Sequence, residues 1–105
     1  MTVGEYQNTL VVSTISVWEI AVKSSIGKLS LPLAVDEWFA LAKTRPGIVI
    51  EPLDPLDTIA STQLPGEFHK DPADRMIVAI ARRRDMELVT ADHKILNYSY
   101  VKTVS

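Results

Sequence analysis

Short runs of β-branched residues alternate with amphipathic segments along this 105-residue chain, and this alternation limits its fold more than any other feature. It is typical of α/β proteins with a mainly parallel sheet. Right-handed crossovers then place helices on both faces of the sheet. We expect strands at 10–16, 48–50, 86–91 and 100–104, helices at 17–28, 35–44, 54–63 and 73–84, and one helical turn from 92.

Capping residues mark the ends of the expected helices. Ser16 is a suitable N-cap with Glu19 three residues later, which is the spacing of a capping box, and Gly27 is a natural C-terminal stop. Asp54 and Asp71 are each followed by proline, and this pair of residues commonly opens a helix. The boundaries are therefore predicted from local chemistry alone.

Apolar stripes on two helices define the expected core. In helix 73–84 the stripe consists of Ile77, Ile80 and Ala81. Helix 17–28 has two stripes, so we expect it to be covered on two sides, with Trp18 packed inside. Trp38 either packs in the same way or lines a groove for a partner helix.

Composition excludes several classes of function. The chain has no cysteine, which rules out disulfides, zinc–thiolate sites and thiol nucleophiles. A net charge of -2 argues against a uniformly basic, nucleic-acid-binding surface, so any RNA must be held by a local basic patch. We find no run of about 18 apolar residues and no signal peptide. We expect one cytoplasmic domain over 1–105, with a polar leader at 1–9.

Three acidic residues fall where an α/β sheet places its chemistry. Glu19 begins the helix after the first strand, Asp74 lies in the first turn of helix 73–84, and Asp92 directly follows a strand. All three are expected at the carboxyl edge of the sheet. Each also suits a purely structural role near a helix start. Together they would repel one another unless a cation is bound, and carboxylates without histidine or cysteine partners favour Mg²⁺ or Mn²⁺.

Three segments carry a resemblance to a known family. The stretches VSTISVWEIAVKSSIGKLSLP, HKDPADRMIVAIARRRDMELVTAD and YVKTVS resemble a PIN domain, and in particular the VapC toxins of type II toxin–antitoxin pairs. The resemblance runs from about Leu10 to the end of the chain. It implies a metal-dependent endoribonuclease, a hydrolase using Mg²⁺ or Mn²⁺, that acts on RNA as a homodimer and is inhibited by a cognate antitoxin.

The resemblance also assigns residues. It makes Glu19, Asp74 and Asp92 the catalytic metal-binding acids, which would activate a water molecule for attack on the phosphodiester. Four accessory positions also match the family's pattern. Of these, Asp71 is also a plain N-cap, and the loop residue His69 either positions substrate or orders its loop. The accessory residues are Asp71, Thr90, Arg75 and His69.

Basic residues near the expected acidic edge could hold RNA phosphates. Arg75, beside Asp74, is the best candidate. For Lys23 and Lys28 we favour the interpretation that they are solvated partners of nearby acids. The remaining members of this group are Lys70 and Lys94.

The chain departs from the family's pattern at its start. The family opens with a central apolar strand ending in aspartate, whereas only MTVGEYQNT precedes the first apolar run here, and its Glu5 is not assigned as a ligand. We therefore expect that strands 10–13 and 87–91 pair directly or leave edges for another chain. A truncated gene or mis-assigned start would explain the difference. The alternatives to an active nuclease are an impaired PIN fragment that binds an antitoxin or other partner, and an α/β domain whose acids only cap helices.

Overall fold

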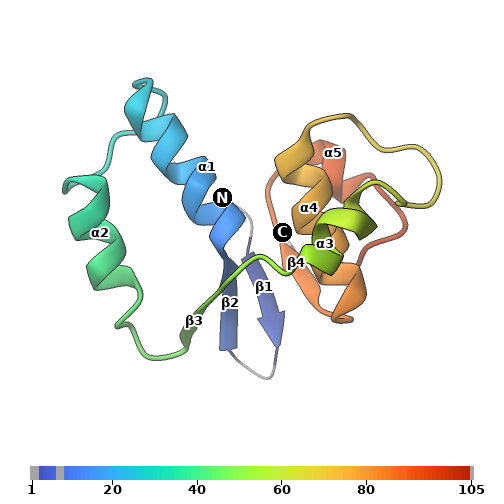
Figure 1. The fold of residues 1–105 in the computed structure, drawn as a ribbon, viewed down its shortest axis with the longest axis horizontal. Coiled ribbons are helices and arrows are strands. Elements are labelled where there is room, and N and C mark those ends of the chain that lie inside the picture. The colour runs from blue at the N-terminus through green and yellow to red at the C-terminus, as the bar shows by residue number, and fades with distance from the viewer. Residues whose placement is uncertain (1–2, 7–8, 105) are drawn as a thin grey trace.

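A strand from the polar N-terminal segment occupies the centre of a five-stranded sheet (Figure 1). The computed structural model describes residues 3–6, by their backbone alone, and residues 9–104. β1 (Val3–Tyr6) lies between β2 (Thr9–Ser13) and β4 (Glu87–Val89). β3 (Ile48–Glu51) and β5 (Thr103–Val104) form the two edges, in the order β3-β2-β1-β4-β5.

β1 runs against the other strands of the sheet. It pairs antiparallel with both β2 and β4, with Gly4 opposite Val11 on one side and Leu88 on the other. The β2–β3 and β4–β5 pairs are parallel, so β1 alone is reversed. The expectations that β2 and β4 pair directly or await another chain are both wrong, because the backbone of β1 satisfies both strands. Of the expected leader, residues 1, 2, 7 and 8 lie outside the described residues.

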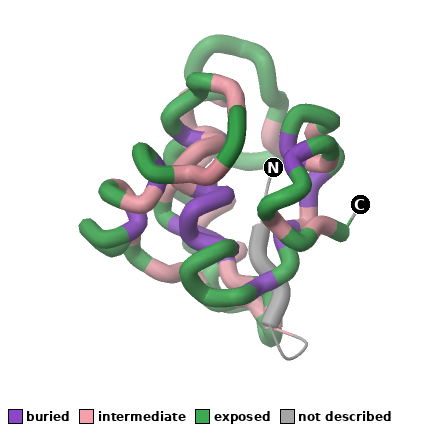
Figure 2. The backbone as a smooth tube through the Cα atoms, turned by 90° about the vertical axis from the view of Figure 1, so that its right-hand side faces the viewer, coloured by how far each residue is buried: buried purple, intermediate pink, exposed green. Residues whose placement is uncertain are grey.

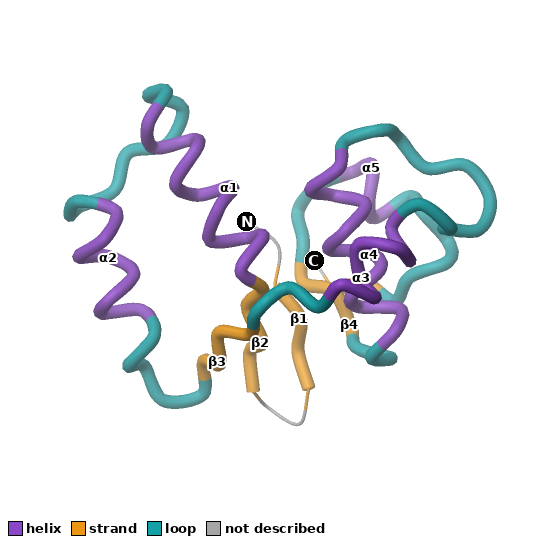
Figure 3. Tube along the Cα trace, viewed as in Figure 1, coloured by secondary structure: helices purple, strands orange, loops and turns teal. Residues whose placement is uncertain are grey.

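Within the described residues, five helices connect and flank the strands. In Figure 3, α1 and α2 stand to the left of the sheet, and α3, α4 and α5 stand to its right. The helices predicted from sequence are all present, with shifted ends, whereas the expected C-terminal strand is reduced to β5. Within the described residues no helix is both long and apolar enough to cross a membrane. The helices are α1 (Thr14–Ser25), α2 (Val35–Ala42), α3 (Pro55–Ser61), α4 (Pro72–Arg83) and α5 (His93–Leu96).

The first helix begins one turn earlier than its sequence predicts. Ser13 is the N-cap of α1, and its hydroxyl accepts a hydrogen bond from the backbone N–H of Ile15 at 3.2 Å. Ser16, predicted to be the cap, is buried inside the helix instead. The capping box with Glu19 is therefore wrong, because Glu19 lies in the second turn, beyond the unpaired N–H groups of the helix start. Glu19 thus has no capping role that would explain its presence.

The core forms where α4 packs on the sheet and the C-terminal segment. The predicted stripe of α4 is confirmed, since Ile77, Ile80 and Ala81 are all buried. Figure 2 colours buried residues purple, and several of them lie on helical segments. Ile77 and Ala81 share one core cluster with Leu88 from β4 and Ile95 from α5. Burying side chains of this size contributes roughly 1.5–3 kcal/mol each before the entropy of ordering them is subtracted.

One face of α1 remains open, contrary to prediction. Trp18 and Ile26, expected to be covered, are 56% and 59% exposed. Trp18 instead lines an apolar surface groove together with Ile15, Leu53 and Met76. The two-sided burial of this helix is therefore wrong within residues 9–104.

Candidate active site

The three acids predicted to converge line one cavity of about 450 Å³. Glu19 comes from α1, Asp74 from the first turn of α4, and Asp92 from the N-cap of α5. α1 and α5 follow strands β2 and β4, and α4 leads back into β4. The carboxyl edge of the sheet thus brings together side chains that are up to 73 positions apart in the chain, as 92 minus 19 gives.

Burial and mutual repulsion make two of these carboxylates harder to ionise. Burial raises the pKa of Glu19, and the nearby charge of Asp74 raises it further, against a smaller opposing effect of Lys23. Burial likewise raises the pKa of Asp74, as do the charges of Asp71 and Asp92, while His69 lowers it. A cation placed among these groups would relieve both effects, since it stabilises the charged forms.

A histidine holds Asp74 from the side of the loop that precedes α4. The Nε2 atom of His69 lies 3.0 Å from Oδ2 of Asp74. Phe68 packs against the imidazole, with ring centroids 4.4 Å apart, and Tyr98 packs against Phe68 at 4.7 Å. The Tyr98 hydroxyl also donates a hydrogen bond to the carbonyl of Pro65. The buried core therefore fixes the position of this loop and of its histidine.

Arg75 is committed to the same loop. Its Nε donates to the Ser61 carbonyl at 2.8 Å, and its Nη1 donates to the carbonyls of Phe68 and His69 at 3.2 and 3.4 Å. These bonds tie the end of α3 and the loop to α4. The described contacts of this arginine, predicted from sequence to hold RNA phosphate, are thus structural.

Asp92 and Asp71 both cap helices in the structure. Asp92 Oδ1 accepts the N–H of Lys94 at 2.9 Å, and the Thr90 hydroxyl accepts the N–H of Asp92 at 3.0 Å. Thr90 is buried, so it anchors the turn that presents Asp92 to the cavity. Asp71 Oδ1 accepts the N–H of Asp74 at 3.1 Å, and Asp71 itself is exposed. Asp71 is not among the residues that line the cavity, which agrees with its interpretation as a cap.

The cavity extends beyond the acids to residues that sequence reasoning assigned elsewhere. Lys23 and Lys28, interpreted as solvated partners of acids, both line it. Leu29, Leu31 and Trp38 add an apolar part to the lining. In the sequence, only the apolar residues of the segment KLSLPL pointed to this part of the lining. Their place in the cavity depends on how the chain turns between α1 and α2.

The donor set suits a hard divalent cation. Three carboxylates with no thiolate or imidazole among the predicted ligands are typical of Mg²⁺ or Mn²⁺ sites. Across residues 9–104, however, no three acidic, histidine or cysteine side chains stand close enough together to form a ready-made metal cluster.

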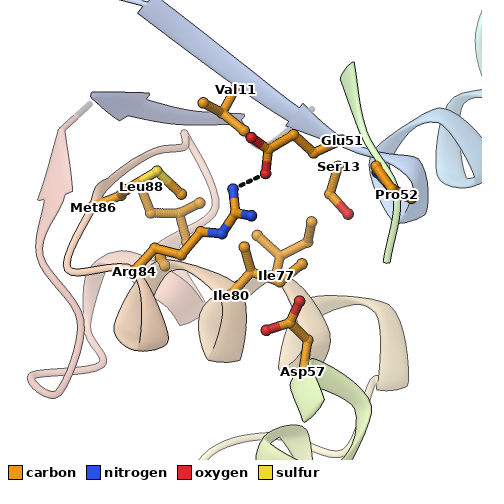
Figure 4. Close-up of a pocket in the computed structure, with 11 residues that line it drawn as sticks. Val11, Ser13, Glu51, Pro52, Asp57, Ile77, Ile80, Arg84, Met86 and Leu88 are labelled. Carbon is orange, nitrogen blue, oxygen red and sulfur yellow. Dashed lines mark ion pairs between the residues drawn. The ribbon is translucent and has the colours of Figure 1, made fainter. Parts of the chain in front are cut away.

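A second hollow, between the sheet and α4, has a different character (Figure 4). Its volume of about 20 Å³ is space for one water molecule. Its charged groups are already paired: Glu51 forms an ion pair with Arg84, and Asp57 forms one with Arg83. These ion pairs connect α4 to β3 and α3, so this hollow belongs to the packing of the domain.

Comparison with known protein families shows which family this chain belongs to. The PIN domain family matches residues 3–99. This chain belongs to the PIN domain family. The resemblance carried by the S-x-x-E, H-x-D-P-x-D-R and T-x-D segments is thereby confirmed.

A curated relative gives the likeness more detail. This PIN domain is 28% identical over 101 residues to Ribonuclease VapC22 of Mycobacterium tuberculosis (strain ATCC 25618 / H37Rv). The match covers 96% of this chain and 76% of the relative. The chain is therefore a VapC-like PIN domain. No solved structure matches it significantly.

Proposed function

We propose that this PIN domain is a VapC-like toxin nuclease that hydrolyses RNA phosphodiesters in the cytoplasm. The observation that carries the proposal is the shared cavity of Glu19, Asp74 and Asp92 in a chain similar to a ribonuclease. Because Glu19 has no capping role in α1, its place in the cavity favours a functional interpretation.

The three acids would hold Mg²⁺ or Mn²⁺. When bound, such an ion lowers the pKa of a water ligand and stabilises charge on the phosphate. The chain's own residues hold the carboxylates in place. His69 lies against Oδ2 of Asp74, and Thr90 fixes the backbone of Asp92, whose Oδ1 is occupied by the helix cap.

The proposed partners are a cognate antitoxin, an RNA substrate and a second copy of the chain. The groove around Trp18 supports the homodimer, because it joins apolar residues of α1 and α4 at the surface and an exposed tryptophan is a frequent interface anchor. Trp18→Glu should therefore lower the molar mass measured by sedimentation equilibrium. An unchanged mass would contradict this interface.

The test of the function compares RNA cleavage by matched acidic variants. With Mn²⁺ present, the wild type should cleave a structured RNA, whereas Asp74→Asn should lose at least about 100-fold in rate, as expected when a charge-stabilising group is removed. Asp85→Asn is the control, because Asp85 is exposed outside the cavity and its positive φ of 51° suits asparagine. Equal rates for the wild type and Asp74→Asn would contradict the proposal. Stabilisation by Mn²⁺ without any cleavage would indicate the non-catalytic binding module.

A further inference from the structure

The acidic cavity is lined by two lysines, two leucines and an indole as well as by the three acids. We propose that these residues form a nucleotide subsite in which the indole of Trp38 stacks on an unpaired base of the RNA, while Lys23 and Lys28 bind the adjoining phosphates. This inference rests on the proposed function and adds to it the single-stranded character of the substrate at the cleavage site. It also assigns a role to residues that no part of the metal chemistry uses.

The size of the cavity calls for a ligand larger than an ion. A volume of about 450 Å³ lies within the range of pockets that bind small organic ligands, roughly 300–1,000 Å³. Glu19, Asp74 and Asp92 account for only part of the lining. The remaining wall combines lysines with leucines and an indole, which is the combination that binds single-stranded nucleic acid.

A helix stop places the two lysines on the same wall. Gly27, with φ 75°, ends α1 in the left-handed conformation that favours glycine. The N–H groups of Gly27 and Lys28 bond back to the carbonyls of Ser24 and Lys23, at 3.3 and 2.9 Å, in the pattern of a Schellman motif. The backbone of Lys28 is thereby held against that of Lys23, and both residues line the cavity.

Trp38 faces this cavity from a helix that contributes little to the core. None of the residues of α2 is buried, and the helix stands on the far side of α1 from α4 (Figure 1). Within it, Asp36 and Glu37 are exposed, whereas Trp38 is half-buried and lines the cavity. A half-buried indole that lines a cavity, in a helix without buried residues, suits stacking on a planar ligand.

The charges of the cavity favour an anionic ligand once a divalent ion is present. The three acids and two lysines sum to -1, and a divalent ion would change this to +1. A nucleic acid should therefore bind more tightly with the ion than without it. A basic peptide, the other occupant that such a cavity could accept, has the opposite dependence, because it would compete with the ion for the acids.

The two tryptophans of the chain allow a direct test. Trp18→Phe leaves Trp38 as the single tryptophan, and Trp38→Phe leaves Trp18, which lines the apolar groove instead. We would titrate each with a single-stranded 12-nucleotide oligouridylate and with a duplex of equal length in Mg²⁺, reading emission directly after mixing. The single strand should quench Trp38 strongly and Trp18 weakly, and the duplex and the Mg²⁺-free titration should each show weaker binding.

Affinity and kinetics then separate stacking from a structural role. Trp38→Ala should weaken oligouridylate binding and raise KM by roughly 5- to 150-fold, the usual effect of losing one base–aromatic stack, with kcat changed less. Trp38→Tyr should restore most of this loss because it keeps an aromatic face. Thermal unfolding of both variants checks that α2 is intact.

Several results would overturn the subsite. These are unchanged Trp38 emission with RNA, equal quenching by duplex and single strand, binding that weakens when Mg²⁺ is added, or a KM unaffected by Trp38→Ala. The measurements distinguish failure of the subsite from failure of the nuclease proposal. Cleavage without quenching of Trp38 refutes the subsite alone, whereas quenching without cleavage supports the subsite and refutes the nuclease activity.

Discussion

Tyr98 connects the buried core to the loop that positions His69. The side chain is only 5% exposed, and its hydroxyl donates to the carbonyl of Pro65. Tyr98→Phe removes that donor and leaves the carbonyl without its partner. We expect the free energy of unfolding at pH 7 to fall by about 1 kcal/mol, measured by urea denaturation. Tyr100→Phe is the control, because Tyr100 is half-exposed, and it should change little.

The same tyrosine predicts a pH dependence. Burial raises the pKa of Tyr98 above its usual value of 10.0, so the folded state holds the phenolic proton more tightly than the unfolded state does. Stability from this group is complete below pH 10 and is lost as the pH rises through the unfolded value toward the folded one. The difference between the wild type and Tyr98→Phe should therefore shrink above pH 10. A constant difference from pH 8 to 11 would contradict this.

His69 is predicted to act through Asp74. Its Nε2 atom lies 3.0 Å from Oδ2 of that acid, and partners of this kind orient metal-binding carboxylates. His69→Ala should weaken Mn²⁺ binding, measured by calorimetry, by about tenfold or more. His93→Ala removes the only other histidine, which is exposed on α5, and should bind Mn²⁺ as the wild type does. Equal Mn²⁺ affinities of the two variants would show that His69 has no part in metal binding.

The sequence predicts helix caps correctly where only one nearby residue can act as the cap. Asp54 and Asp71 cap their helices as expected, since each precedes a proline, which a helix accepts in its first turn. At the start of α1, Ser13 and Ser16 both suit a cap, and the extent of strand pairing with β3 decided for Ser13. The sequence cannot rank two such serines, because pairing with a distant strand determines the choice.

At the scale of the element, the start of α4 carries two acids for which we propose different roles. Asp71 caps the helix through the N–H of Asp74. Asp71→Ala should lower the free energy of unfolding by about 1 kcal/mol, and Asp71→Ser, which keeps a capping oxygen, should recover most of it. Both variants should retain the thermal stabilisation by Mn²⁺. Loss of that stabilisation in Asp71→Ser would show that Asp71 is itself a ligand.

The helices differ in how well their surroundings could be predicted. The buried stripe of α4 followed from spacing alone, because this helix packs on both the sheet and its neighbour α3. The apolar residues of α1 have equally regular spacing, yet Trp18 remains exposed. Periodicity shows that a helix has an apolar side but not whether another part of the same chain covers it.

For the whole molecule, the family, the α/β class and the gathering of the acids in one cavity all followed from sequence. The central strand did not. VGEY has a glycine and a charge within four residues and lacks the apolar run of a buried strand, so its local signal is weak. Its placement follows from the unpaired backbone edges of β2 and β4, a non-local demand that local patterns do not encode.

The central position of β1 makes the whole sheet sensitive to its backbone. Glu5 pairs with Leu10 of β2 and with Glu87 of β4, so proline at this position removes a ladder donor from a strand that is bonded on both sides. Glu5→Pro should lower the free energy of unfolding by more than about 1 kcal/mol, which for a domain of this size lowers Tm by at least about 4 °C. Glu5→Thr, which changes the charge but keeps the donor and suits a strand, should be close to the wild type. Because β1 joins the two halves of the sheet, Glu5→Pro should also reduce hydrogen-exchange protection in both β2 and β4. Protection lost from one of these strands alone, or from neither, would mean that β1 does not bridge them in solution.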